Sequence, residues 1–179
     1  MTRLLRLLRL LAPRYQATSV LQLSPAVLRA WGIDALMVDL DNTLVPWGDG
    51  VPPAAVREWI DGLRRSGIRL CIVSNNLSAR VQQVASQLGV PAAQGRFKPS
   101  AGKLRHALRL LGSPPERTAM VGDQLFTDVL AGNRLGVPTV LTGPLAPHEP
   151  RRIRMLRGLE RWLLAWLARQ GSVPERPRV

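Results

Sequence analysis

The sequence contains few cysteines, few acidic residues and no long apolar run, and each shortage excludes a class of protein. Cys71 is the only cysteine, so a disulfide framework within the chain is impossible. The uncharged apolar stretches are much shorter than the ~20 residues that a membrane-spanning helix needs. Arg3, Arg6 and Arg9 interrupt the leucine run near the N-terminus, which therefore lacks the apolar core of a signal peptide. These absences predict a cytoplasmic protein.

Lysine is also scarce, although the chain is strongly basic. The formal net charge is +13, from 25 basic and 12 acidic residues, and Lys98 and Lys103 are the only lysines. Residues 1–15 contain four arginines and no acid, and residues 148–179 contain eight arginines and three glutamates. Hydrophobic residues make up 46% of the chain and charged residues 21%, as in packed globular proteins. Its length of 179 residues suits one domain or slightly more.

The middle of the chain alternates between short apolar runs and amphipathic segments that end at a glycine. We expect helices over residues 53–66, 78–88, 99–111 and 126–135. We expect buried strands over residues 35–40, 68–73, 90–93, 118–121 and 137–141. Strands and helices that alternate across short connections are typical of an α/β fold. The prediction is a doubly wound, Rossmann-like, mostly parallel sheet flanked by helices.

Polar residues follow the predicted strands at what should be one edge of the sheet. In open α/β sheets, ligands bind beyond the carboxyl ends of the strands. The residues expected at this edge are Asp39, Asp41, Ser74, Asn75, Lys98, Asp123 and Asp128. The chain has seven aspartates, and four of them belong to this set. We therefore expect these side chains to form one site.

The types of residue in this set suit phosphoryl transfer. Four carboxylates that crowd together repel one another, and a hard divalent cation such as Mg²⁺ relieves that repulsion. A carboxylate can attack phosphorus while its neighbour handles protons. Ser74 and Asn75 offer a hydroxyl and an amide to phosphate oxygens, and Lys98 offers a compact positive charge. An in-line nucleophile, a metal ion and a cationic clamp are the parts that phosphoryl transfer requires.

Four short motifs contain these residues in a fixed order. The first is Asp39-Leu40-Asp41-Asn42-Thr43, and it is followed by Ser74, Lys98 and finally Gly122-Asp123 with Asp128. Together they resemble the motifs of the haloacid dehalogenase superfamily, the first of which is Asp-x-Asp-x-Thr. The runs over residues 39–45, 73–76 and 122–129 are similar to the YqeG-type subgroup (subfamily IIIA). The resemblance covers roughly residues 13 to 160, and the subgroup includes phosphatases of phosphatidylglycerophosphate.

The resemblance implies a phosphatase that works through an aspartyl-phosphate. Asp39 would be the nucleophile, and Asp41 would protonate the leaving oxygen and then activate water. Ser74 would bind the transferred phosphoryl group together with the neighbouring Asn75. Lys98 would neutralise the charge of that group.

The resemblance also implies a set of Mg²⁺ ligands. They would be the carboxylates of Asp39 and Asp123 and the main-chain carbonyl of Asp41. Asp128 would be either a direct ligand or a support that acts through water.

The spacing between the motifs leaves no room for a large cap domain. Residues 44–73 can hold a loop, one helix and one strand, and residues 77–97 can hold one helix and a short strand. An open site suits a phosphate carried on something large. A lipid headgroup at a bilayer, a nucleic-acid end and a phosphoprotein all fit this description.

The two ends of the chain read as basic amphipathic helices on either side of a catalytic core. We expect such helices over residues 1–15 and 148–170, the core over residues 16–147 and a flexible tail over residues 171–179. In the C-terminal helix, one face would carry Met155, Leu156, Leu159, Trp162, Leu163, Trp166 and Leu167, with arginines opposite. This pattern is typical of a membrane-surface helix, and anionic lipid would attract the arginines. The alternative is that the apolar faces dock on the core.

Three function classes remain open at this stage. The leading hypothesis is a Mg²⁺-dependent phosphatase that dephosphorylates phosphatidylglycerophosphate, an anionic phospholipid, at the inner face of the membrane. The second is a phosphatase of soluble phosphometabolites or nucleic-acid ends, although no reader motif for nucleic acid is present. The third is a non-catalytic interaction module, against which an intact Asp41 argues. The oligomeric state is open, because exposed apolar helix faces could also form a dimer.

Overall fold

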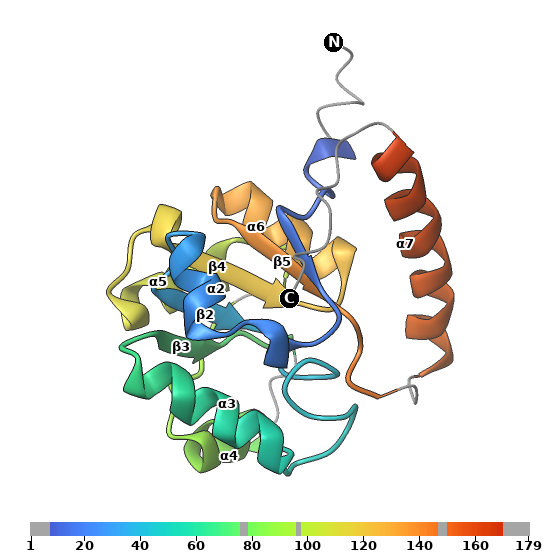
Figure 1. Cartoon of the computed structure of the whole chain (residues 1–179). Coiled ribbons are helices and arrows are strands. Elements are labelled where there is room, and N and C mark those ends of the chain that lie inside the picture. Colours follow the sequence, from blue (N-terminus) through green and yellow to red (C-terminus); the bar gives the residue numbers. More distant parts are fainter. Residues whose placement is uncertain (1–7, 76–78, 96–97, 147–149, 170–179) are drawn as a thin grey trace.

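The centre of the structure is a parallel sheet of five strands. The structure is a computed structural model, and it describes residues 8–75, 79–95, 98–146 and 150–169 (Figure 1). The sheet has the strand order β1-β5-β4-β2-β3, and every pairing is parallel. The strands are β1 (Tyr15–Ala17), β2 (Ala35–Val38), β3 (Arg69–Ile72), β4 (Thr118–Gly122) and β5 (Thr139–Thr142). The chain adds β3 on one side of β2 and then β4 and β5 on the other, which confirms the predicted doubly wound sheet.

Helices cover both faces of this sheet. One face packs against α2 (Pro25–Ala30), α3 (Ala54–Arg65) and α4 (Ala79–Leu88), and the other against α5 (Gly102–Leu111) and α6 (Leu130–Leu135). The shorter elements are the 3-10 helices η1 (Val20–Gln22) and η2 (Pro115–Arg117) and the π-helix η3 (Leu125–Val129). A last long helix, α7 (Arg151–Arg169), lies beside the β1–β5 side of the molecule (Figure 1).

Strand β2 shows how its sequence places it between two helical layers. Leu36 and Val38 belong to a buried cluster with side chains of α3 and α4. Ala35 and Met37 belong to a second buried cluster with side chains of α5 and α6. Successive side chains of a strand point to opposite faces, so a strand covered on both faces is apolar throughout. All four residues are fully buried, as the continuous apolar run predicts.

The first strand of the sheet differs from the sequence prediction. The expected helix over residues 1–15 does not reach Tyr15, which begins β1 and lies opposite Val140 of β5. Residues 1–7 of that predicted helix lie outside the described residues, as does the predicted tail over residues 171–179. Three residues are too few to show a strand periodicity in the sequence.

The predicted strand over residues 90–93 does not form. This segment runs beside β3 and makes the isolated bridge between Ile72 and Ala92. The N–H of Ile72 donates to the carbonyl of Pro91 at 2.8 Å, and the N–H of Ala93 donates back to the carbonyl of Ile72 at 2.8 Å. The segment therefore pairs with the edge strand β3 at a single bridge and does not extend into a strand.

The connections between the strands contain no cap domain in the described part of the chain. One helix, α3, stands between β2 and β3, and α4 follows β3 before the chain returns to the sheet edge. Among the described residues, no helix is both long enough and apolar enough to cross a bilayer.

Helix α7 docks with only part of its apolar face. Leu163 and Leu167 are buried against Leu125 and Val129 of η3. The side chains of Met155, Leu159 and Trp162 stay 79%, 52% and 64% exposed. Docking on the core is therefore correct for Leu163 and Leu167, whereas Met155, Leu159 and Trp162 face solvent.

Candidate active site

Asp39 and Asp41 lie where the chain leaves β2 and turns. The N–H of Asp39 donates to the carbonyl of Val121 in β4 at 2.9 Å, so this residue still belongs to the sheet edge. Asn42 has a positive φ of 59°, a left-handed conformation that asparagine tolerates better than most residues. The chain therefore turns immediately after Asp41.

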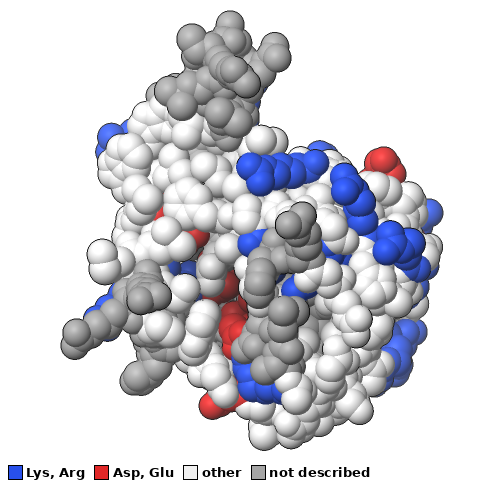
Figure 2. All heavy atoms as spheres, turned by 180° about the vertical axis from the view of Figure 1, so that it is seen from behind, with Lys and Arg blue, Asp and Glu red and all other residues white. Residues whose placement is uncertain are grey.

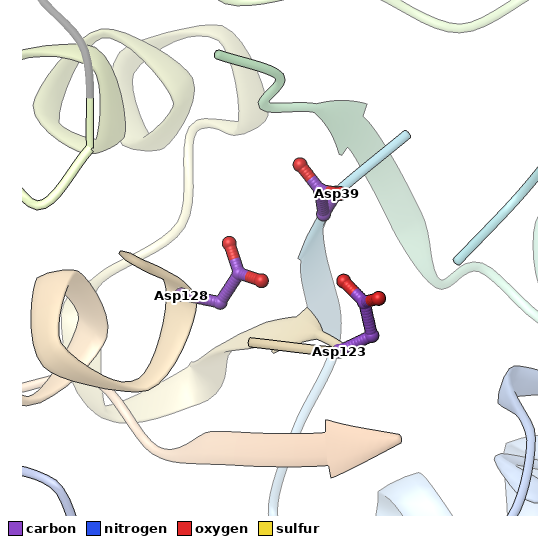
Figure 3. A group of neighbouring side chains, drawn as sticks. All are labelled: Asp39, Asp123 and Asp128. Carbon is purple, nitrogen blue, oxygen red and sulfur yellow. The ribbon is translucent and has the colours of Figure 1, made fainter. Parts of the chain in front are cut away.

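Three buried carboxylates face one another at the carboxyl edge of the sheet (Figure 3). Asp39 follows β2, Asp123 follows β4, and Asp128 lies on η3. One carboxylate oxygen of each lies within 4.8 Å of the corresponding oxygens of the other two. All three residues are at least nine-tenths buried. The structure thus brings together three of the four aspartates that the sequence assigned to a metal.

Lys98 is the buried cation of this cluster. Its Nζ donates to Asp39 Oδ1 at 2.5 Å and to Asp128 Oδ1 at 2.6 Å. Burial alone would lower the pKa of Lys98, but the charges of Asp128 and Asp39 outweigh burial and raise that pKa above its usual range. Lys98 is therefore protonated at neutral pH. It links two carboxylates that come from different elements.

Lys98 and Arg157 do not fully offset the negative charge of the three buried carboxylates. Burial raises the pKa of Asp39 to about 7, although Lys98 opposes the rise and Asp128 adds to it. Burial also raises the pKa of Asp123 well above its usual range; Asp39 and Asp128 reinforce this shift, and Arg157 opposes it. Raised pKa values of this kind mean that the ionised forms need a further cation.

The buried acidic triad could bind a metal ion, and the structure provides a direct test of the fit. Oδ1 of Asp123 is buried and has no hydrogen-bond partner within the described part of the chain. Leaving a buried acceptor unpaired costs about 1–3 kcal/mol, and more when it is charged. Carboxylate oxygens are the ligands that hard divalent cations prefer. Asp39, Asp123 and Asp128 therefore suit such a cation.

The side chain of Asp41 points to a different partner. Its Oδ1 accepts a hydrogen bond from Nη2 of Arg80, on α4, at 2.5 Å. Arg80 also donates from Nη1 to the carbonyl of Asp49 at 2.5 Å. Asp41 thus stands outside the carboxylate triad. This position suits an acid or base better than a side-chain metal ligand.

The residues after β3 build the opposite wall of the site. Ser74 is buried, and its carbonyl accepts a hydrogen bond from the Nζ of Lys103. Asn75 binds the main chain of Lys98 at both ends: its Oδ1 accepts from that N–H at 2.6 Å, and its Nδ2 donates to that carbonyl at 3.2 Å. Asn75 therefore holds in place the residue that carries the buried ammonium group.

Thr43 contributes a buried hydroxyl beside the first motif. The residue is 2% exposed, and its Oγ1 makes no hydrogen bond to any described residue. A hydroxyl can donate as well as accept, so Oγ1 suits an anionic oxygen that enters the site.

Helix α7 reaches into the site through two charged side chains. Arg157 donates from Nη1 to the carbonyl of Asp123 at 3.0 Å, and its Nη2 contacts the Asp123 carboxylate. Glu160 is 4% exposed, and its Oε1 accepts from the N–H groups of Leu125 at 2.7 Å and Phe126 at 3.3 Å. These two N–H groups open η3, the element that carries Asp128.

Four of these residues escaped the sequence analysis: Arg80, Lys103, Arg157 and Glu160. Lys103 left a signal, because it is one of only two lysines in a chain that otherwise uses arginine. Burial lowers the pKa of Lys103, and the charge of Lys98 lowers it further. The arginines and Glu160 left no signal, because they sit among many similar charges along amphipathic helices.

The comparisons with known proteins agree with this geometry. The family model of haloacid dehalogenase-like hydrolases matches residues 49–136. The chain is 34% identical to a probable phosphatase, YqeG, of Bacillus subtilis, across 87% of this chain and 90% of that one. It is 31% identical to phosphatidylglycerophosphate phosphatase 1 of Arabidopsis thaliana, across 83% of this chain but only 45% of that longer protein.

The fold matches a solved structure as well. A crystal structure of an uncharacterized protein from Listeria monocytogenes covers 70% of this chain and 99% of its own, with a TM-score of 0.51 and 17% identity. At this identity the match concerns the fold alone. The family follows from the sequence matches: the chain belongs to the haloacid dehalogenase-like hydrolases, and it is a phosphatase of that family.

Proposed function

We propose that the protein is a Mg²⁺-dependent phosphomonoester hydrolase that dephosphorylates phosphatidylglycerophosphate at a membrane surface. The observation that carries the chemistry is the buried triad of Asp39, Asp123 and Asp128 around the ammonium group of Lys98. A phosphomonoester brings two negative charges, which only a strongly cationic site can accept. A lysine and a divalent cation together supply that charge.

Asp39 and Asp41 divide the reaction between them. A carboxylate oxygen of Asp39 attacks phosphorus, and the bond from phosphorus to the leaving oxygen breaks as Asp41 gives that oxygen a proton. Asp41 then takes a proton from the water that attacks the aspartyl-phosphate, which releases inorganic phosphate. The Arg80 guanidinium at 2.5 Å keeps Asp41 apart from the triad and orients it for this work.

Polar groups around Asp39 hold the phosphoryl oxygens. Lys98 lies within hydrogen-bond distance of Asp39, so it can contact an oxygen of a phosphoryl group attached there. The hydroxyl of Thr43, which has no hydrogen-bond partner among the described residues, can donate to another phosphoryl oxygen. Ser74 and Asn75 stand at the end of the neighbouring strand β3, and Asn75 fixes the main chain of Lys98.

Asp39, Asp123 and Asp128, with the main-chain carbonyl of Asp41, would hold Mg²⁺. When bound, Mg²⁺ supplies positive charge that offsets the phosphate oxygens and keeps the carboxylates ionised. Lys98 already neutralises part of the negative charge of the triad.

Two observations support a lipid substrate. Relatives at 31% identity from Arabidopsis thaliana and Chlamydomonas reinhardtii are phosphatidylglycerophosphate phosphatases. The second observation is the exposed apolar stripe of α7, formed by Met155, Leu159 and Trp162. Tryptophan beside aliphatic side chains on a basic helix suits the interface of a bilayer, and anionic lipid attracts the arginines.

The test is phosphate release from purified protein with Mg²⁺. Phosphatidylglycerophosphate in phosphatidylcholine vesicles is compared with p-nitrophenyl phosphate, with Asp39→Asn as the inactive control. Turnover of the lipid that disappears in Asp39→Asn supports the proposal. Turnover of p-nitrophenyl phosphate alone would support the phosphatase activity and contradict the lipid substrate. The proposed substrate would then be a soluble phosphomonoester.

A further inference from the structure

A cavity of about 540 Å³ opens directly beside the carboxylate triad and has no part in the reaction steps above. Asp123 belongs to both, because it is a triad member and also lines the cavity. The remaining walls come from the carboxyl ends of β1 and β5, from η3 and from one side of α7. On the face seen in Figure 2, acidic side chains lie in a central hollow and basic side chains occupy the surface around it.

Three arginines of α7 line this cavity: Arg154, Arg157 and Arg161. Residues spaced by three and four share one face of a helix and stand one turn apart. Arg157, the middle one, binds both the carbonyl and the carboxylate of Asp123. With Arg157 at Asp123, Arg154 and Arg161 flank the cavity about one turn to either side of Arg157.

The acidic residues of the cavity do not neutralise Arg154 or Arg161. Asp123 is paired with Arg157, and Glu160 accepts the N–H groups of Leu125 and Phe126. Within the ranges that the structure describes, no carboxylate lies within ion-pair distance of Arg154 or Arg161. Both arginines are exposed to solvent, so a ligand can reach them. The wall therefore carries two positive charges next to the reacting centre that no described carboxylate pairs with.

The rest of the wall is less polar. Leu125, Leu141 and Leu164 contribute apolar surface, and the main chain approaches closely where β5 ends. A Cβ added at Gly143 would stand 2.7 Å from the carbonyl oxygen of Thr18, so the floor there requires glycine. A cavity with a cationic rim and a partly apolar wall suits a short carbon chain that ends in an anionic group.

We infer that this cavity is a specificity site for a second anionic group of the substrate, held by Arg154 and Arg161 while the phosphomonoester lies at Asp39. The inference rests on the proposed function and assigns the residues that would hold the further phosphate-type anion of its substrate. A phosphodiester separated from the reacting phosphate by a glycerol unit has this chemistry. The exposed apolar stripe of α7 lies on the other flank of the helix, so lipid contact and anion contact use different residues.

The experiment compares two water-soluble substrates that share the same reacting end. Glycerol 1-phosphate carries only the phosphomonoester, whereas glycerophosphoglycerol phosphate adds a phosphodiester. Arg154→Gln and Arg161→Gln should each lower kcat/KM for glycerophosphoglycerol phosphate by about tenfold, since an ionic hydrogen bond is lost. Both variants should leave kcat/KM for glycerol 1-phosphate unchanged. Arg169→Gln, which removes an equal charge from α7 away from the cavity, should change neither value.

A second measurement keeps the inference testable without turnover. Glycerophosphoglycerol, which has the phosphodiester but no monoester, should bind the wild-type protein in calorimetry and lose about tenfold in affinity in Arg154→Gln or Arg161→Gln. If neither substrate is hydrolysed, the proposed function fails. The calorimetric binding of glycerophosphoglycerol then tests the anion site by itself. Equal effects of the variants on both substrates, or no binding of glycerophosphoglycerol by the wild type, would overturn the inference.

Discussion

Gly122 is the residue at which a single methyl group should disable the site. It is the last residue of β4 and precedes Asp123 directly. A Cβ built at Gly122 would lie 2.3 Å from both Cγ and Oδ2 of Asp128 and 2.6 Å from its Cβ. Real Cβ atoms essentially never come this close to another heavy atom, so Gly122→Ala must displace one of the two residues. The backbone of Gly122 is part of the sheet, and therefore Asp128 has to move.

The displacement can be estimated from ordinary contact distances. Moving the Asp128 carboxyl group from 2.3 Å to van der Waals contact requires a shift of about 1 Å. That shift lengthens the 2.6 Å hydrogen bond from Lys98 and opens the triad that Asp128 forms with Asp39. Misplacing a positioned catalytic group by 1 Å costs about 100-fold in rate, and overpacking a core costs about 1–3 kcal/mol of stability.

The assay measures Mn²⁺ affinity, phosphatase turnover and urea unfolding for the variant. Gly122→Ala should stay folded, lose about 1–3 kcal/mol of stability and lose about 100-fold in turnover, with weakened Mn²⁺ binding. Gly62→Ala is the matched control, because a Cβ there has no heavy atom within 4 Å. In a helix interior that substitution should be neutral or stabilise by up to about 1 kcal/mol. A Gly122→Ala protein that binds Mn²⁺ and turns over like the wild type would refute this reasoning.

Four further predictions concern Asp39, Glu160 and Trp162. Because the folded protein raises the pKa of Asp39 to about 7, protons compete with a divalent cation, and Mn²⁺ affinity should fall by up to about tenfold per pH unit below pH 7 in a calorimetric titration. The same shift means that the folded carboxyl keeps its proton at pH values where the unfolded one has lost it. Metal-free stability in urea should therefore fall as pH rises from about 4 to 7, and a pH-independent stability would contradict this. Glu160→Ala leaves the N–H groups of Leu125 and Phe126 without their acceptor and should cost about 1–3 kcal/mol in urea unfolding, whereas Glu160→Gln keeps an acceptor oxygen and should cost less. Trp162→Ser should reduce sedimentation with anionic vesicles by about tenfold without changing urea stability, since its side chain is 64% exposed; unchanged sedimentation would remove Trp162 from the membrane contact.

The carboxylate cluster was predictable because strand ends converge in parallel sheets. Asp39 and Asp123 follow continuous apolar runs, and Asp128 comes five residues after the second of them. Once the sheet is parallel, the carboxyl ends of β2 and β4 meet at one edge, and the side chains that follow them must be neighbours. The four motifs also predicted Lys98 beside these acids, and the structure places it there.

The partners supplied by α7 were not predictable, because periodicity defines the faces of a helix but not which face docks. The sequence pattern puts Leu163 and Trp162 on the same apolar face of α7. In the structure Leu163 is 5% exposed and Trp162 is 64% exposed, because the core is narrower than the apolar face. The rotation that results brings Arg157 to Asp123 and Glu160 to the start of η3. Such contacts depend on tertiary packing, which a single helical sequence does not specify.

Strand β1 escaped prediction for a related reason. Tyr15–Ala17 is three residues long, and it belongs to the sheet because Tyr15 and Ala17 lie opposite Val140 and Thr142 of β5. The ring of Tyr15 also stacks on Trp31, with 3.8 Å between ring centroids. These contacts join residues far apart in the sequence. A local pattern of apolar residues could not reveal them.

The most direct test of the account is to trap the phosphoryl group on Asp39. An aspartyl-phosphate is reduced by borohydride to homoserine, which mass spectrometry locates in the sequence. With p-nitrophenyl phosphate, whose leaving oxygen needs no proton from Asp41, Asp41→Asn should accumulate the intermediate, because this variant cannot activate the water that releases phosphate. During turnover of phosphatidylglycerophosphate with Mg²⁺, the account predicts homoserine at position 39 and at no other aspartate. Homoserine at position 123 or 128, or phosphate release that continues in Asp39→Asn, would contradict it.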